Sequence, residues 1–231
     1  MNIGKVIIKL SKMLFAIFLP LAILLTILQY YSYNEDMYME EFKKYDIASA
    51  TKMSLEDLNR TANKLISYMK DDEDNLDIKA VINGELAEVF GQREKQHMVD
   101  VKELFIKGHR VKNISLVLTF AALITIVLYS RNRKRDIYGA VLWAGIVPII
   151  LMIILFILVK IDFHKYFTYF HKLFFTNDLW LLNPQTDVLI QMLPLEFFID
   201  ISTRIIGCFV GISILMTIIA YINLKKKPRV S

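Results

Sequence analysis

Histidine is the side chain best suited to accept a proton and return it at neutral pH, because a neutral imidazole titrates at about 6.5. The sequence contains four histidines, and none lies in a strongly apolar run. They are His97, His109, His164 and His171. General acid–base catalysis is therefore the first chemistry to consider.

His97 stands midway between two carboxylates, with Glu94 three residues before it and Asp100 three residues after it. Residues three or four apart share one face of a helix. We therefore expect either carboxylate to be able to hold the imidazole and raise its basicity. A single histidine on an amphipathic helix is more often a surface residue than a catalyst, so the spacing alone leaves both interpretations open.

His164 and His171 are seven residues apart, a spacing that places them on one face of a helix. Beside them runs an aromatic stripe at helical spacing, formed by Phe163, Phe167, Phe170 and Phe174. Aromatic rings with polar neighbours favour the headgroup layer of a bilayer, which predicts a helix at the membrane interface. His109 has no comparable surroundings and is interpreted as structural.

Other chemistries lack their motifs. The only cysteine, Cys208, lies in an apolar run, and no Gly-x-Ser-x-Gly, P-loop or dinucleotide fingerprint is present. The zinc motif HExxH is absent, and Glu94-x-x-His97 occurs once, whereas di-iron bundles need such a pair twice. We therefore expect neither a cofactor nor a metal.

The distribution of apolar residues predicts the helices that position these histidines. Hydrophobic residues make up 55% of the chain, and the mean hydropathy is +0.42. The excess collects in four runs without charges, each near the ~20 residues that a helix needs to cross a bilayer. The runs are 13–30, 114–129, 140–159 and 205–222. The predicted fold class is an all-α membrane protein with four transmembrane helices.

Basic residues predict the orientation of these helices. With four crossings, three basic clusters fall on one side, which the positive-inside bias makes the cytoplasm. The clusters are Lys5, Lys9 and Lys12; Arg131, Arg133, Lys134 and Arg135; and Lys225, Lys226, Lys227 and Arg229. The net charge of +5 is thus a topology signal, and nucleic-acid binding is not expected.

The first run lacks a small-x-small cleavage pattern, so we interpret it as an uncleaved anchor. A transporter is disfavoured because the crossings contain no charged residue at mid-depth.

The expected organisation has five parts, all in a multi-pass protein of the cell membrane with both termini cytoplasmic. They are 1–33, a cytoplasmic segment and the first crossing; 34–113, a small extracellular α+β domain; 114–159, the second and third crossings with their basic turn; 160–204, the extracellular interfacial segment; and 205–231, the fourth crossing and the tail. Within 34–113 we expect a helix capped by Ser54, a hairpin turning at Asn83-Gly84, and a polar helix over 93–105. The stretch 188–198 is apolar but too short to span.

Two sequence signatures resemble those of a known family. One is Glu94-x-x-His97-Met98-x-Asp100-Val101-Lys102. The other is Phe170-His171-x-x-Phe174-Phe175-x-Asn177-Asp178-x-Trp180, followed by Pro184, Asp187, Leu189-Ile190 and Pro194-x-x-Phe197-Phe198. With the layout of four helices, they resemble the Gram-positive integral membrane family that includes the lipoprotein intramolecular transacylase. The resemblance covers nearly the whole chain.

The resemblance implies an enzyme that acts at the outer face of the membrane on diacylglyceryl-modified lipoproteins. It would move an acyl chain from the glyceryl moiety to the α-amine of the lipidated cysteine, giving a lyso-form lipoprotein. The essential histidines of the family would fall on His97 and His171, although His164 stands in a similar Phe-His context. Glu94, Asp100, Asn177 and Trp180 match motif positions and are supporting candidates.

Two further functions stay open on sequence grounds. One is a different lipid-directed hydrolase or transferase of the same family, and the other is a non-catalytic membrane scaffold or sensor. The expected partners are the lipoprotein substrate and membrane lipids. The oligomeric state, and which histidine acts as the base, are not predicted.

Overall fold

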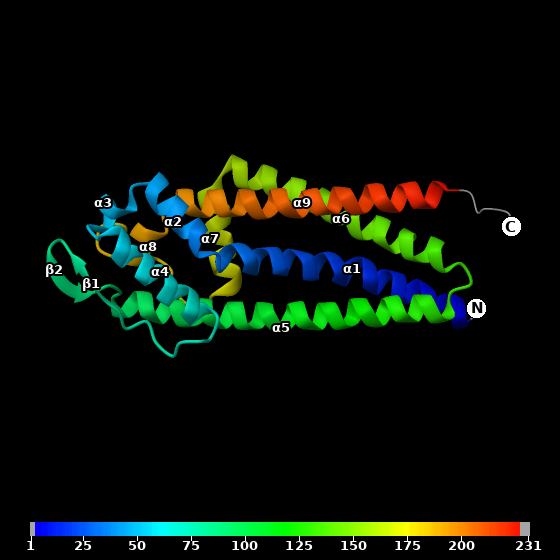
Figure 1. Cartoon of the computed structure of the whole chain (residues 1–231), viewed down its shortest axis with the longest axis horizontal. Helices are drawn as coiled ribbons and strands as arrows, with labels where there is room; N and C mark the ends of the chain where they lie inside the picture. Colours follow the sequence, from blue (N-terminus) through cyan, green and yellow to red (C-terminus); the bar gives the residue numbers. More distant parts are fainter. Residues whose placement is uncertain (1–2, 227–231) are drawn as a thin grey trace. The chain divides into compact units, whose positions relative to one another are not determined.

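The computed structural model describes residues 3–226, so Lys227 and Arg229 of the last basic cluster lie outside the described residues. The chain divides into two compact units, and three helices continue from one unit into the other (Figure 1). Unit 1 comprises Met1–Leu28, His109–Ile161 and Thr203–Ser231, and unit 2 comprises Gln29–Gly108 and Asp162–Ser202.

Unit 1 is a bundle built from segments of four long helices. These are α1 (Ile3–Ser32), α5 (Gln92–Tyr129), α6 (Arg133–Ile161) and α9 (Leu195–Lys225). All four are long and apolar enough to cross a membrane, which confirms the predicted number of spans. Many large apolar side chains on their surfaces are exposed, among them Ile150, Leu151 and Leu215. Such exposure is expected of helices whose surroundings are lipid tails rather than water.

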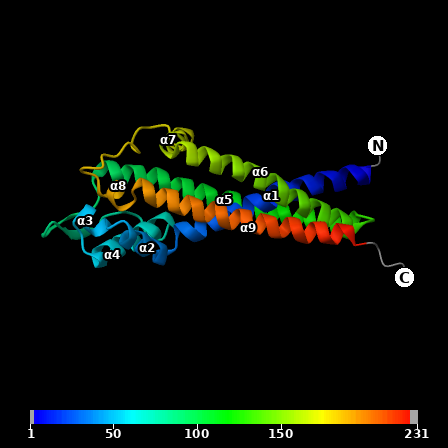
Figure 2. The same cartoon turned by 90° about the horizontal axis from the view of Figure 1, so that it is seen from above.

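The first turns of α1, the turn between α5 and α6, and the last turns of α9 lie at one end of unit 1 in both views (Figure 1, Figure 2). The Lys12 ammonium donates to the Asp136 carboxylate at 2.8 Å, and the Ser130 hydroxyl donates to its other oxygen at 2.6 Å. These bonds tie α1 to the α5–α6 turn. The described members of the three basic clusters are therefore close to this one end, as four crossings require.

Helices α6 and α9 approach closely at Gly145. A Cβ built there would lie 2.3 Å from Thr217 Oγ1 and 2.8 Å from the Ser213 carbonyl oxygen. Only glycine fits this position without moving α9. Small residues at helix contacts are the usual way in which membrane helices gain van der Waals contact.

Unit 2 is mainly helical and carries one small sheet. It contains α2 (Glu35–Lys44), α3 (Ile47–Thr51), α4 (Leu55–Met69), the strands β1 (Lys79–Ile82) and β2 (Glu85–Glu88), α7 (Phe163–Phe174) and α8 (Val188–Met192). The last turn of α1 and the first turns of α5 and α9 complete the unit. Its core is apolar, and its most buried side chains include Phe42, Leu58, Leu65, Ile66 and Met192.

The local predictions within 34–113 are confirmed. The Ser54 hydroxyl accepts from the Asp57 amide at 3.0 Å and caps α4. Strands β1 and β2 pair antiparallel, with Ile82 opposite Glu85. Asn83 and Gly84 both have positive φ, at 55° and 86°, as a two-residue type I′ turn demands.

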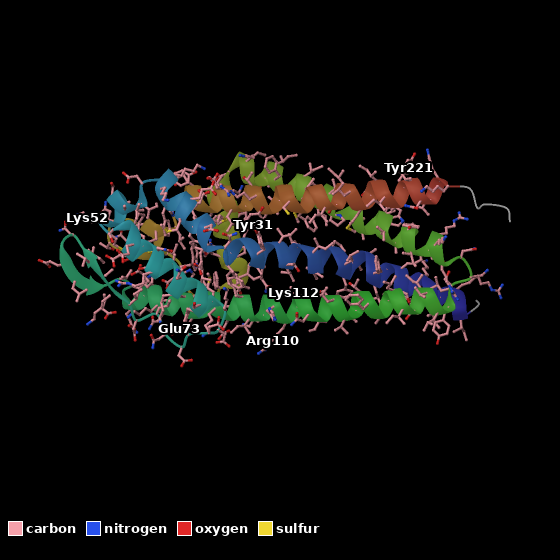
Figure 3. All side chains as sticks on the ribbon, in the orientation of Figure 1. Tyr31, Lys52, Glu73, Arg110, Lys112 and Tyr221 are labelled. Atoms are coloured by element: carbon pink, nitrogen blue, oxygen red, sulfur yellow. The ribbon has the colours of Figure 1, made fainter. Side chains whose placement is uncertain are left out.

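The predicted aromatic helix is α7, whose start is capped by the Asp162 carboxylate accepting from the Lys165 amide at 3.0 Å. The apolar stretch 188–198 divides at Pro194, with α8 before it and α9 after it. Helix α9 thus begins ten residues before the predicted crossing, and α5 begins well before 114. Ahead of the apolar run, mainly polar residues extend α5, and a mixture of apolar and polar residues extends α9. On α5 Arg110 and Lys112 mark this change of composition (Figure 3).

Candidate active site

The site lies in unit 2, and its first fixed point is Glu94 in the opening turn of α5. This carboxylate is only 3% exposed. One oxygen accepts from the Leu189 amide at the start of α8, and the other accepts from the Gly91 amide, both at 2.6 Å. Glu94 therefore joins α8 to the beginning of α5. Burial raises the pKa of Glu94, and the two donated hydrogen bonds oppose that rise.

His97 lies one turn further along α5 and is 7% exposed. Its Nδ1 has no hydrogen-bond partner within residues 3–226. Burial and, to a smaller extent, the neighbouring His171 lower the pKa of His97 to about 4, against the opposing effect of the Asp100 carboxylate. The ring is therefore neutral at physiological pH.

The prediction that a flanking carboxylate on α5 holds the His97 ring is wrong, although Asp100 does act to raise the pKa of that ring. Glu94 uses both oxygens on backbone amides, and Asp100 accepts from the Asn177 side chain, so neither holds the His97 ring. The basicity of His97 is lowered, because the cost of burying a charged imidazole outweighs the attraction of Asp100. Helical spacing placed the three residues on neighbouring positions but gave no information on burial.

His171 comes from α7 and is also 7% exposed. Its Nδ1 lies 2.8 Å from the carbonyl oxygen of Phe167, one turn earlier. A carbonyl oxygen can only accept, so Nδ1 carries the proton and, in the neutral ring, Nε2 carries the lone pair. Burial lowers the pKa of His171, and the bond to Phe167 opposes this. His171 is thus a neutral imidazole with a defined tautomer.

The two histidines approach one another. Their ring centroids are 6.1 Å apart, with an interplanar angle of 35°. Phe175 contacts both rings, at 5.3 Å from His97 and 5.5 Å from His171. Helices α5 and α7, whose histidines are far apart in sequence, thus bring two imidazoles into one buried cluster.

Aromatic rings surround His171. Phe167 lies at 4.3 Å, Trp180 at 4.9 Å and Phe170 at 5.5 Å between ring centroids. Phe198 on α9 extends this wall through its contact with Phe167 at 5.0 Å. The wall keeps water away from the imidazoles and offers an apolar surface to a lipid chain.

A chain of hydrogen bonds positions Trp180. Asn177 donates through Nδ2 to the Asp100 carboxylate at 2.8 Å, and its Oδ1 accepts from the Leu179 amide at 3.1 Å. The Trp180 indole N–H donates to the Asn177 carbonyl oxygen at 3.0 Å. Asp100 on α5 therefore fixes the loop that places Trp180 against His171.

Comparison with known proteins shows the family to which the chain belongs. The family model described as lipoprotein intramolecular transacylase Lit matches residues 13–198, which include both histidines and all four supporting candidates. The chain belongs to this transacylase family.

Solved structures support the same fold. The in meso structure of the membrane integral lipoprotein intramolecular transacylase Lit from Bacillus cereus matches with a TM-score of 0.80 at 25% identity, over 94% of this chain and 96% of that chain. Two further structures of that protein, each with one histidine substituted, match at 24% identity with TM-scores of 0.74 and 0.72. They cover 94% of this chain, and 92% and 94% of their own chains. A comparison with curated proteins found no match.

Within this member of the transacylase family, the remaining histidines lie elsewhere. His164 is exposed on α7, seven residues before His171, which is about 10 Å along a helix. His109 is exposed on α5. Among residues 3–226 no group of three or more histidine, cysteine, aspartate or glutamate side chains is arranged to hold a metal ion.

Sequence reasoning missed two residues that contact the histidines. Phe167 supplies the carbonyl that fixes the tautomer of His171, and Phe175 packs against both imidazoles. Both are four residues from His171, one turn on either side, so they could have been found by listing the helical neighbours of that histidine. Their helical pattern indicates a membrane interface, and the family signature contains Phe175 but assigns it no role.

Proposed function

We propose that this chain is a lipoprotein intramolecular transacylase that moves an O-acyl chain of a diacylglyceryl lipoprotein to the α-amine of its N-terminal cysteine. The product is a lyso-form lipoprotein. The observation that carries the proposal is the pair of neutral, buried imidazoles 6.1 Å apart in a chain of this family. We assign catalysis to His97 and His171.

The reaction asks little of the protein beyond orientation and proton transfer. Conversion of an ester to an amide is downhill, so no nucleotide or other energy source is needed. Donor ester and acceptor amine belong to one molecule, and holding them in contact removes most of the entropic barrier. This makes a site of two imidazoles and aromatic walls chemically sufficient.

His171 is the proposed base. The α-amine titrates at about 8, so at neutral pH most of it is an ammonium that must first lose a proton to solvent. The free amine then attacks the ester carbonyl carbon, and the new N–C bond forms as the carbonyl becomes an oxyanion. His171 Nε2 takes the second proton from nitrogen, since Nδ1 is committed to the Phe167 carbonyl oxygen. It returns that proton to the glyceryl oxygen as the C–O bond breaks.

His97 is the proposed oxyanion donor. A neutral imidazole carries one N–H, and a low pKa keeps His97 neutral beside a protonated His171. Donation of this N–H to the oxyanion would stabilise the tetrahedral intermediate. Two rings in one dry site could not both be charged at acceptable cost.

The supporting residues act through the histidines. Glu94 fixes the start of α5 and hence His97, whereas Asp100 and Asn177 fix the loop that holds Trp180 over His171. Phe167, Phe170 and Phe198 offer the apolar wall along which acyl chains would lie. We propose them as positioning and binding residues.

The proposal includes the orientation of the chain. Both termini would be cytoplasmic, because the basic clusters favour that side, and the histidine site would lie at the extracellular face. Neither ATP nor acyl-CoA is present there, so an acyl donor already in the membrane suits the reaction. The interfacial helix α7 would hold the site at the depth where a lipid presents its esters.

The test uses the purified chain in lipid vesicles with a synthetic diacylglyceryl lipopeptide, followed by fragmentation mass spectrometry. The wild-type chain should convert the substrate to an N-acyl product of equal mass. His97→Ala and His171→Ala should each lower the rate by about 10²-fold or more, the usual contribution of general acid–base catalysis. The matched controls His164→Ala and His109→Ala, both exposed, should keep the wild-type rate.

Other outcomes would favour the competing functions. Release of free fatty acid without an N-acyl product would indicate a lipid-directed hydrolase. An unchanged lipopeptide, with wild-type thermal stability of the protein, would favour a scaffold or sensor. Equal loss of rate in the His164 and His171 variants would contradict the assigned site.

A further inference from the structure

A groove that the proposed reaction does not use lies between α1 and α6 in unit 1. It encloses about 350 Å³, at the lower end of the roughly 300–1,000 Å³ typical of ligand pockets. Its lining comes from one face of each helix: Lys9, Met13 and Ile17 follow one another at spacings of four on α1, and Trp143 and Val147 do so on α6.

The groove exists because small residues face each other at its floor. Ala16 on α1 and Ala140 on α6 leave the space between the helices unfilled. Ala140 is 1% exposed and packs with Phe15 and Ala122, so a solid core lies beneath the groove. The walls stand open to the surroundings, with Trp143 59% and Ile17 54% exposed.

The chemistry of the groove changes at its mouth. Its lining is almost wholly apolar, and Lys9 and Lys12 line the end nearest the start of α1 through the apolar stems of their side chains, which leaves their ammonium groups at its edge. Lys12 is already paired with Asp136 at 2.8 Å. Within residues 3–226 Lys9 has no ion pair, so its charge is available to a ligand.

An apolar slot in a membrane helix pair, with an uncompensated ammonium at its mouth, is complementary to an anionic amphiphile. We propose that the groove binds one acyl chain of a phospholipid whose phosphodiester headgroup carries net negative charge, with that headgroup at Lys9. Basic pockets between transmembrane helices on the cytoplasmic side are known to suit such headgroups. None of the lining residues belongs to the histidine site, so this inference does not rest on the proposed reaction.

The volume of the groove and its exposed walls determine which part of a lipid it can bind. A groove of this size holds one acyl chain, and its open side leaves the other chain of the lipid in the bilayer. Zwitterionic lipids share the acyl chains but offer Lys9 no net charge. The distinguishing property is therefore headgroup charge, which an experiment can vary at constant chain composition.

The test is native mass spectrometry of the purified full-length chain in detergent. Equimolar phosphatidylglycerol and phosphatidylcholine with identical acyl chains are added together, and the ratio of bound lipids is measured. The wild-type chain should prefer phosphatidylglycerol by about fivefold, the effect of one lysine near a membrane surface. Lys9→Gln should bring the ratio close to one.

Two further variants make the test specific. Lys5→Gln removes an equal charge from the same exposed end of α1 but lies outside the groove, and it should keep the wild-type ratio. Ala16→Phe should fill the groove and reduce retention of both lipids, with Ala16→Ser as a control of nearly unchanged size. Thermal denaturation checks that each variant is folded.

The proposal is overturned if the wild-type chain binds both lipids equally, or if Lys5→Gln and Lys9→Gln lower the ratio to the same extent. Retention of phosphatidylglycerol by a folded Ala16→Phe variant would also overturn it. Transacylase activity is not a readout, so failure here leaves the proposed function untouched.

Discussion

At the scale of single residues, burial determines the chemistry of the histidines. An imidazolium that leaves water loses its hydration, so the neutral form is favoured unless a carboxylate compensates. Among residues 3–226, His97 has no such partner at its Nδ1, and the Nδ1 of His171 contacts a carbonyl oxygen. Both rings therefore enter the reaction neutral, one with its lone pair directed by the Phe167 carbonyl. A base and a hydrogen-bond donor are available at the same pH.

This protonation state can be measured. We expect the His97 ring to stay neutral as the pH falls through 6.5 and to become charged only near pH 4, because its pKa is lowered to about 4. Nuclear magnetic resonance of the ¹⁵N-labelled histidines in detergent would follow the titration, with His97→Asn used to assign the signal. A His97 signal that titrates at or above pH 6.5 would contradict the proposed role as neutral donor.

At the scale of elements, the site depends on how α5, α7 and α8 are joined. Glu94 bridges α5 and α8 through backbone amides, and Asp100 reaches the loop after α7 through Asn177. Each bond crosses between segments distant in the sequence, so each fixes the approach of one helix to another. The hydrogen bonds of Glu94 and Asp100 therefore help to maintain the distance between the two histidine rings.

The Glu94 link gives a prediction on stability. In Glu94→Gln the single side-chain oxygen still accepts from one of the two backbone amides, those of Leu189 and Gly91, but the side-chain NH₂ faces the N–H of the other. A buried donor is then left without an acceptor, at a cost of about 1–3 kcal/mol. Thermal denaturation in detergent should therefore show a lower melting temperature. The control is Glu103→Gln, an exposed glutamate on the same helix that pairs with Lys107 at 2.9 Å.

An equal melting temperature for both glutamine variants would show that Glu94 does not hold α8. Reduced acyl transfer by Glu94→Gln at a temperature where it is folded would support its role in placing His97.

Much of the local structure could be predicted from the sequence because short-range physics decides it. The Ser54 cap, the turn at Asn83-Gly84 and the aromatic helix each depend on residues within four positions of one another. The full length of α5 could not be predicted from hydropathy. Its polar first half belongs to unit 2, where packing rather than lipid stabilises the helix.

The site could be predicted only in part, and for a similar reason. The spacing of Glu94, His97 and Asp100 predicted that these three residues share one face of a helix but assigned the carboxylates to the wrong partners. Their true partners, the Leu189 amide and the Asn177 side chain, are 95 and 77 residues away in the chain. Such pairings follow from tertiary packing, which helical spacing does not contain.

At the scale of the whole molecule, the account requires an even number of crossings with both ends in the cytoplasm. The prediction can be tested by cysteine labelling after Cys208→Ser removes the single native thiol. In intact cells a membrane-impermeant maleimide should label Asp74→Cys, next to Glu73 in unit 2 (Figure 3). It should label Arg131→Cys, in the α5–α6 turn, only after permeabilisation. The reverse pattern would invert the proposed topology.

The central claim is that one acyl chain moves within one lipopeptide at the paired histidines. The most direct measurement mixes two lipopeptides, one labelled in both peptide and acyl chains and the other in neither, and analyses the products by fragmentation mass spectrometry. If the transfer is intramolecular, the wild-type chain should form N-acyl products in which the labels of peptide and acyl chain stay together, and His171→Ala should form none. Products with exchanged labels, or no N-acyl product at all, would contradict it.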